Sequence, residues 1–298
     1  MLLMQKTSIQ DLVRNYTIET TVPQATRVER FADLVPMGTC LYIAHIPGTD
    51  FKDTVALAAR LRQEGMEPVP HVVGRRIESR AVLADFLARL SGDAGVKQVL
   101  VVAGDNSDPA GEFTSGLQVL ESGLLEQNGI RKIGVAGHPE GHREVADPAL
   151  RDALRRKNAY KEKTGGDVYV VTQFAFSADP VLAWEASHRE DIGKLPVTVG
   201  LPGLATAKTL LKYAMDCGVG ASLQAFSKRY ASLTKLLTVS APDDAVVALA
   251  AHRERTPSSP LSGVHFFPFG GLKKTADWAN KVVAGEFDLN GEGGITVR

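Results

Sequence analysis

Short runs of apolar and β-branched residues alternate along the chain with longer stretches in which apolar residues recur every three or four positions. The short runs predict buried strands, and the longer spacing predicts amphipathic helices. Because eight strand segments each precede a helical stretch, the pattern predicts an α/β fold of the (β/α)8 TIM-barrel type. The eight segments are residues 16–22, 39–46, 67–74, 97–104, 132–138, 167–174, 197–203 and 263–270.

The helical stretches carry start and stop signals. Asp50 precedes the apolar-periodic VALAARLRQ and Gly65 follows it, as expected for a helix N-cap and a C-terminal glycine. We expect one domain over residues 1–298, with an insertion before the last strand that holds helices near 223–237 and 243–255. Because residues 285–298 are Gly-rich and show little periodicity, they predict a loose surface tail.

An open, doubly wound sheet is the alternative α/β arrangement. Its usual signature is a glycine-rich turn after the first strand. Here the first strand segment ends in Thr-Val-Pro-Gln, which contains no glycine. The pattern therefore favours the closed barrel.

Composition and charge exclude several classes of protein. The 34 Lys and Arg residues balance 34 Asp and Glu residues, so neither nucleic acid nor a membrane surface is an expected partner. Cys40 and Cys217 lie far apart in no metal-like or redox spacing, which argues against a disulfide scaffold or a zinc module. With no apolar run of about 18 residues and no signal-like N-terminal segment, we expect a cytoplasmic protein.

Candidate chemistry gathers where the predicted strands end, which is where TIM barrels hold their active sites. A single buried histidine is usually a hydrogen-bonded structural residue, but five of the seven histidines fall at this one rim. The polar residues there are Glu19, His45, His71, Asp105, His138, Glu140, His142, Gln173 and His265.

Glu19 is the sharpest of these candidates, because it interrupts a strand of β-branched residues. If it faces the barrel mouth, desolvation lets its carboxyl group keep a proton and act as a general acid. If it faces outward, it would pair with a lysine of a flanking helix. Asp105 follows Gly104, which would let a ligand approach the backbone, and Asp105 could bind that ligand or cap a helix.

The remaining candidates are the His138–His142 pair, which resembles a metal site, and Gln173, which suits ligand binding. His138 and His142 have the spacing of a metal pair, but Pro139 and Gly141 argue against the helix that would align them. We therefore expect no metal site. The amide of Gln173 suits recognition of another amide or a heterocycle, or else caps the chain locally.

Six motifs resemble, in order and spacing, those of the methylenetetrahydrofolate reductase family, and the resemblance covers roughly residues 18–283. It implies reduction of 5,10-methylenetetrahydrofolate to 5-methyltetrahydrofolate with NADH or NADPH, usually through FAD. The motifs are ETTVP from Glu19, VPHV around His71, AGD ending at Asp105, HPEGH from His138 to His142, VTQFAF around Gln173 and HFF from His265 to Phe267.

The resemblance also implies residue roles. Glu19 would protonate N10 and open the ring to an N5 iminium, and Asp105 would stabilise that cation. Gln173 would bind the pterin, while Gln224 and Phe226 would hold the folate, although Phe226 equally suits helix packing. Cofactor contacts would come from His71, Ala103, Gly104, Asp105, His138, His142, Asn158, Lys161 and Lys163.

The chain departs from the family pattern chiefly at the flavin positions. Ala103 stands where an arginine is usual, and the helix that normally contacts FAD retains only Asn158 with Lys161 or Lys163. Two routes stay open: weakly bound FAD, or hydride transfer directly from the nicotinamide. The alternatives are a metal-dependent barrel hydrolase or lyase and a folate-binding protein without catalysis. Barrels of this size commonly self-associate, which leaves a homo-oligomer open.

Overall fold

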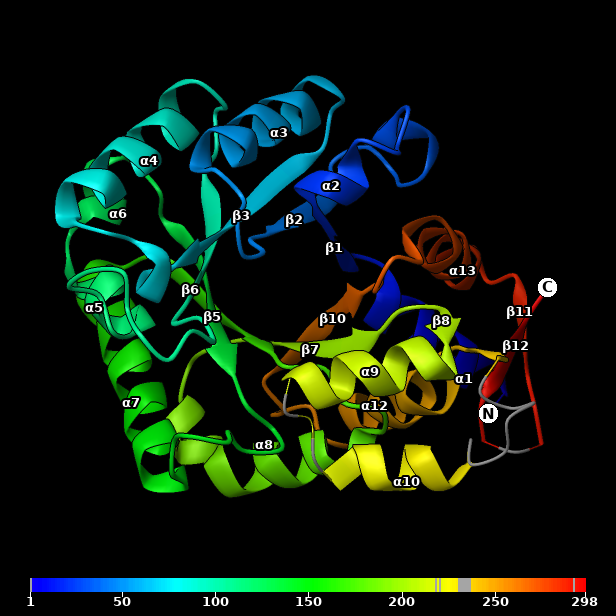
Figure 1. The fold of residues 1–298 in the computed structure, drawn as a ribbon. Helices are drawn as coiled ribbons and strands as arrows, with labels where there is room; N and C mark the ends of the chain where they lie inside the picture. The colour runs from blue at the N-terminus through cyan, green and yellow to red at the C-terminus, as the bar shows by residue number, and fades with distance from the viewer. Residues whose placement is uncertain (1, 218, 220, 230–236, 292) are drawn as a thin grey trace.

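Eight parallel strands close into a barrel in a computed structural model that describes residues 2–217, 219, 221–229, 237–291 and 293–298 (Figure 1). The predicted TIM barrel is confirmed. Around the barrel the strands follow the order β1, β10, β7, β6, β5, β4, β3, β2. Their bounds are β1 Thr17–Thr21, β2 Cys40–Ala44, β3 Glu67–Val73, β4 Gln98–Val102, β5 Lys132–Gly137, β6 Asp167–Thr172, β7 Val197–Pro202 and β10 Leu261–Phe267.

Helices surround the strands as the apolar spacing predicted. At α3 the expected caps are present, since Asp50 accepts a hydrogen bond from the Lys52 amide at 2.8 Å and Gly65 has a left-handed φ of 81°. Among the described residues, no helix has the length and apolar character needed to cross a membrane. The outer helices are α2 Val22–Ala25, α3 Phe51–Gln63, α4 Arg80–Gly92, α5 Gly116–Glu121, α6 Leu124–Gln127, α7 Asp147–Thr164, α8 Ala178–Ile192 and α13 Leu272–Ala284.

The segment between β7 and β10 contains the expected additional helices. These are α9 Ala207–Cys217, α10 Ala221–Arg229 and α12 Asp243–Arg255, with a small antiparallel pair, β8 Ala205–Thr206 and β9 Val239–Ser240. Helix α12 matches its predicted range, and α10 covers the first part of 223–237, of which residues 230–236 lie outside the described residues. Because α12 packs against α8, it completes the outer ring beside β10.

An N-terminal helix was not predicted, and the C-terminal segment differs from expectation. An N-terminal helix, α1 Leu2–Val13, packs against α12 and α13 and buries Ile9 and Leu12. The prediction of a loose C-terminal tail is wrong, because β11 Phe287–Leu289 and β12 Ile295–Val297 form an antiparallel hairpin. Its glycines lie in and around the turn, while Phe287 and Ile295 are buried and β12 contacts the outer helices α12 and α13.

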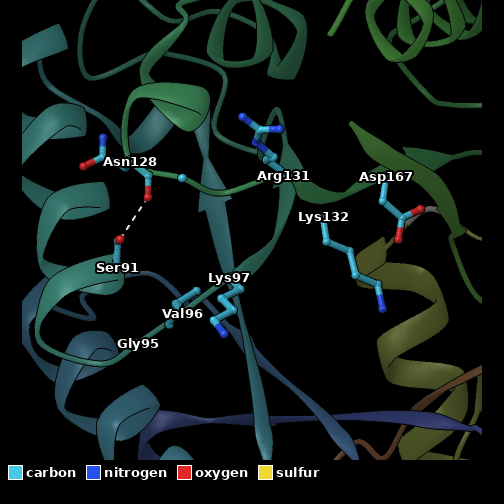
Figure 2. A pocket seen from close by; sticks show the side chains of 9 residues that line it. Ser91, Gly95, Val96, Lys97, Asn128, Arg131, Lys132 and Asp167 are labelled. Carbon is cyan, nitrogen blue, oxygen red and sulfur yellow. Dashed lines mark hydrogen bonds between the residues drawn. The ribbon is translucent and has the colours of Figure 1, made fainter. Parts of the chain in front are cut away.

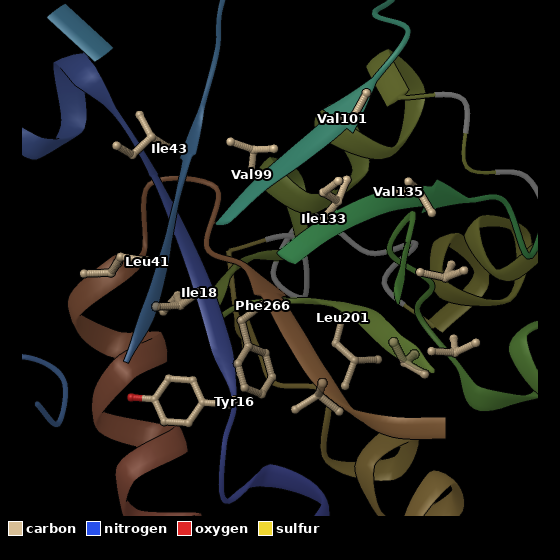
Figure 3. Close-up of a cluster of buried hydrophobic side chains, with 14 of the residues drawn as sticks. Tyr16, Ile18, Leu41, Ile43, Val99, Val101, Ile133, Val135, Leu201 and Phe266 are labelled. Atoms are coloured by element: carbon tan, nitrogen blue, oxygen red, sulfur yellow. The ribbon is translucent and has the colours of Figure 1, made fainter. Parts of the chain in front are cut away.

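Alternate strand residues face the helices or the barrel lumen, which positions the site. The helix-facing set is aliphatic and includes Ile18, Leu41, Ile43 and Val135 (Figure 3). The lumen-facing set is mixed, with Tyr42, Val69, Leu100, Tyr169 and Val171 filling the middle of the barrel. A Cβ atom on Gly134 would lie 2.9 Å from the Tyr169 hydroxyl, so glycine leaves room there for the tyrosine ring.

Candidate active site

The carboxyl group of Glu19 lies inside the barrel between two histidines. On β1, Ile18 and Thr20 are buried on the helix side, so Glu19 points into the lumen rather than toward a flanking helix. Its Oε2 lies 3.6 Å from Nε2 of His265 on β10 and 3.9 Å from Nε2 of His71 on β3. The side chain is 15% exposed, so a ligand at the mouth could reach it.

The Nε2 atoms of both imidazoles face the carboxyl group of Glu19. Within the described part of the chain, neither Nε2 atom has a hydrogen-bond partner. His265 is fully buried and its Nδ1 lies 2.7 Å from Oγ1 of Thr17. Burial lowers the pKa of His71 to about 4, against the opposing effect of the Glu19 carboxylate, so His71 is neutral at physiological pH. The cluster therefore offers a ligand the carboxyl group of Glu19 and the neutral imidazole of His71.

The lowered pKa of His71 predicts a loss of stability in mild acid. In the unfolded chain its imidazole takes up a proton near pH 6.5, whereas in the folded protein it does so only near pH 4. Since the unfolded state binds more protons between these values, the free energy of unfolding should fall by about 2 kcal/mol for His71 alone as the pH drops from 7 to 5. Urea unfolding at both pH values measures this. The His71→Gln variant should lose correspondingly less, and an equal loss in both proteins would contradict the assignment.

Gln173 lies directly after β6, beside the mouth. Its backbone amide donates to Gly137 O at 2.8 Å, and its side-chain oxygen accepts from the Phe174 amide at 3.0 Å. The local capping contact expected as an alternative role is therefore present. It also fixes the direction of the amide group, as a binding role would require.

An aromatic wall, formed by Phe174, Phe176, Phe226, Phe267 and Phe269, lies beside Gln173. Phe226 of α10 stacks on Phe176 at 4.1 Å, and Phe174 contacts the rings of Phe267 and Phe269. Phe226 is 8% exposed, so it packs within this wall, which agrees with the packing role given as its alternative. The role of Phe176 and Phe269 was missed, because their contacts join segments distant in sequence.

Gln224 and Asp105 both lie at the surface. Gln224 is an exposed residue of α10. The Asp105 side chain is 89% exposed and pairs with Arg76 at 3.2 Å, in the loop after Ala103 and Gly104. The described contacts therefore join Asp105 to Arg76 and not to the Glu19 cluster.

The histidines after β5 lie next to a half-buried lysine, Lys157, which was not predicted. The rings of His138 and His142 meet edge to face at 5.2 Å. Lys157 of α7 donates to Ala136 O at 2.7 Å, and burial lowers its pKa to about 8. Burial, with Lys157 adding to it, lowers the pKa of His138 to about 3. In the described ranges, no group of three His, Cys, Asp or Glu side chains could hold a metal ion.

Three expected cofactor residues on α7 do not reach the mouth. Asn158 accepts from the Lys194 amide at 3.0 Å, just before β7 begins, and Lys161 donates to Val168 O at 3.1 Å, where β6 begins. Lys163 is exposed near the end of the same helix. Helix α7 starts at the mouth and its 18 residues span about 27 Å, so residues late in it lie toward the opposite end of the barrel. The structure therefore corrects the expectation that Asn158, Lys161 and Lys163 contact a cofactor at the mouth.

Comparison with known proteins gives a family match and similarities to solved structures. A family model described as methylenetetrahydrofolate reductase matches residues 14–250. An uncharacterized protein from Clostridium thermocellum, described as binding two copies of 5-methyl-5,6,7,8-tetrahydrofolic acid, has a TM-score of 0.55 at 13% identity, covering 89% of this chain and 97% of its own. A family 18 chitinase from Crocus vernus matches at a TM-score of 0.49 and 11% identity, over 90% of this chain and 98% of its own. At such identity the first structural match supports the barrel fold.

Proposed function

The chain belongs to the methylenetetrahydrofolate reductase family, and we propose that it is an oxidoreductase that reduces 5,10-methylenetetrahydrofolate to 5-methyltetrahydrofolate with NADH or NADPH. The observation that carries the proposal is the Glu19 carboxyl group inside the barrel, flanked by His71 and His265. The description of the C. thermocellum protein names a tetrahydrofolate as its ligand, which supports folate as the substrate class.

Glu19 is the proposed proton donor. Its carboxyl proton passes to N10 of the folate, and the electron pair of the bond between N10 and the methylene carbon stays on N10 as that bond breaks. The carbon is left as an N5 iminium cation, which accepts a hydride from the reduced nicotinamide and becomes the methyl group. The carboxylate left on Glu19 stabilises the cation. His71 and His265 hold the carboxyl group toward the ligand.

The substrate ring is proposed to lie between Gln173 and the aromatic wall. The amide of Gln173 can pair with donors and acceptors of the pterin. Phe176 and Phe226 stack on one another in this wall, which supports it as a rigid surface for the aromatic part of the folate. Gln224, exposed on α10, is proposed to bind the outer part of the substrate. Asp105 is proposed to add negative charge at the rim.

The residues assigned to FAD by resemblance do not fit that group. Bound flavin would supply a carrier for the hydride between nicotinamide and folate. However, Asn158 and Lys161 bond to the chain near the opposite end of the barrel, and Ala103 replaces the usual arginine. The neighbouring Arg75 is engaged by the carbonyl oxygens of Thr114 and Asn106. We therefore propose that hydride passes directly from the nicotinamide, whose ring would lie near His138, His142 and Gly104.

An assay of the purified protein tests both parts of the proposal. With methylenetetrahydrofolate, NADH or NADPH should be oxidised at a rate that added FAD does not change, and the protein should have no flavin absorption. Activity that depends on added FAD would contradict the direct route alone. No oxidation with or without FAD, together with tight binding of 5-methyltetrahydrofolate, would contradict catalysis and favour a folate-binding protein.

A further inference from the structure

A cavity of about 530 Å³, here called the lower cavity, lies at the end of the barrel opposite the mouth, where the strands begin. The lumen of a TIM barrel is usually filled by layers of bulky branched side chains. Here the small residues Cys40, Thr198 and Gly263 line the space instead. A Cβ atom on Gly263 would lie 3.7 Å from the Leu12 carbonyl oxygen, an ordinary van der Waals distance, so packing does not require glycine there. The volume left open is that of a small-molecule site.

Hydrogen-bonded side chains close the inner end of the lower cavity. The hydroxyl oxygens of Tyr42 and Tyr169 are 2.7 Å apart, and the amide nitrogen of Gln98 donates to the Tyr169 hydroxyl oxygen at 2.6 Å. Both tyrosines belong to the buried cluster that fills the middle of the barrel. On the other side of this layer, the Tyr42 ring lies 4.5 Å from the ring of His265, between centroids. The lower cavity is therefore separate from the site around Glu19.

Lys132 and Asp167 place opposite charges next to one another at the lower cavity. They begin β5 and β6 and are register partners, so their Cα atoms lie about 5 Å apart. In the described part of the chain, neither side chain makes a hydrogen bond or an ion pair. Figure 2 shows both at the starts of neighbouring strands, beside a second cavity of about 450 Å³ that they line together with Lys97. Arg14, which also lines the lower cavity, pairs with Asp11 at 2.5 Å.

The titratable hydroxyl and thiol groups of the lower cavity are neutral. Burial raises the pKa of Tyr169 to about 12, and it also raises the pKa values of Tyr42 and Cys40. All three side chains therefore keep their protons at physiological pH. Among the described residues that line this cavity, Lys132 and Asp167 thus remain as one cation and one anion for a ligand to pair.

We propose that the lower cavity is a second binding site, which takes a zwitterion of the α-amino acid class with an apolar side chain. The carboxylate of the ligand pairs with the ammonium group of Lys132, and the ammonium group of the ligand pairs with the carboxylate of Asp167. A simple anion would be repelled by Asp167 and a simple cation by Lys132, so a ligand that carries both charges is favoured. The side chain of the ligand lies against an apolar wall formed by Tyr16, Pro36, Met37 and Pro196.

The inference is independent of the proposed function, because the lower cavity is lined by none of the three residues of the Glu19 cluster, all of which the structure describes. Binding can thus be measured without turnover.

Matched ligands test whether both charges are recognised. Titration calorimetry of the purified protein should detect binding of L-leucine or L-phenylalanine. The analogues without the ammonium group are 4-methylpentanoate and 3-phenylpropanoate, and those without the carboxylate are 3-methylbutylamine and 2-phenylethylamine. Each analogue should bind about 10-fold more weakly or worse, because one charge-assisted hydrogen bond is lost. The proposal is wrong if neither amino acid binds at millimolar concentration, or if an analogue binds as tightly as its parent amino acid.

Substitutions test whether Lys132 and Asp167 are the partners. Lys132→Met and Asp167→Asn should each weaken binding of the amino acid about 10-fold or more. Because both side chains are exposed at strand starts, the variants should unfold at the wild-type temperature. Lys97→Met is the matched control, since Lys97 is an exposed lysine of the second cavity, and it should bind as the wild-type protein does. Equal losses in Lys97→Met and Lys132→Met would show a general effect of charge and overturn the site.

Competition with a folate separates the lower cavity from the mouth. Excess 5-methyltetrahydrofolate should leave the Kd of the amino acid unchanged, whereas full displacement would place the amino acid at the mouth and overturn the site. If the wild-type protein fails to oxidise NADH, the proposed function fails, but the binding measurements still test the lower cavity.

Discussion

Glu19→Gln is expected to lower kcat for methylenetetrahydrofolate reduction by about 10²–10⁴-fold, the range over which a positioned general acid contributes. Glutamine has nearly the shape of glutamate and can still contact His71 and His265, but its amide cannot deliver an acidic proton to N10. The ring would then open only with a proton from water. The Kd for the folate should stay nearly unchanged, since the loss falls on the transition state. Turnover and equilibrium binding, measured on the same sample, separate the two effects.

A matched control is available outside the cluster. Glu78 is an exposed glutamate in the loop after β3, so Glu78→Gln makes the same chemical change without touching the lumen. It should retain the kcat of the wild-type protein. If Glu19→Gln keeps full activity, Glu19 is not the acid, and if it fails to fold, Glu19 has a structural role instead.

The barrel and the Glu19 cluster could be predicted because both follow from local patterns. The apolar runs located the strands and placed Glu19, His71 and His265 at a common rim, but whether Glu19 faced the lumen stayed open until the structure showed its carboxyl group beside the two histidines. Nothing local signalled the contact between Tyr42 and Tyr169, whose hydroxyl groups meet across the closed barrel. Only the closure of the sheet brings them together.

Position along a helix explains the main error at the site. Asn158 and Lys161 lie on the helix that follows β5, and the sequence alone did not say how far down the barrel each one sits. The structure shows that Asn158 holds the loop at Lys194 instead. Lys157, one residue earlier, faces another way and reaches back to Ala136 near the end of β5. Because consecutive helix residues point about 100° apart, Lys157 contacts the carbonyl of Ala136 on β5 whereas Asn158 contacts the loop at Lys194.

Gly200→Ala is expected to lower the free energy of unfolding by about 3 kcal/mol, through overpacking just beyond the last paired residues of β6 and β7. A Cβ atom at this position would lie 2.3 Å from the backbone oxygen of Thr172 and 2.8 Å from the Phe267 ring. The backbone of Thr172 cannot move aside as a flexible side chain could. Gly200 also accepts a hydrogen bond from the Ala175 amide and donates one to the Thr172 hydroxyl, so both strands must shift together. Urea unfolding of the two proteins measures the difference.

Gly92→Ala gives the control with the opposite sign, because nothing lies within 4 Å of a Cβ atom at Gly92 at the end of α4. Alanine favours the helix over glycine, so this variant should gain up to about 1 kcal/mol. The displacement in Gly200→Ala passes through Thr172 to Gln173, so weaker folate binding should accompany the lost stability, whereas Gly92→Ala should bind normally. Wild-type stability in Gly200→Ala would show that the two strands are not packed as described. Lost stability with full folate binding would instead argue that Gln173 does not contact the pterin.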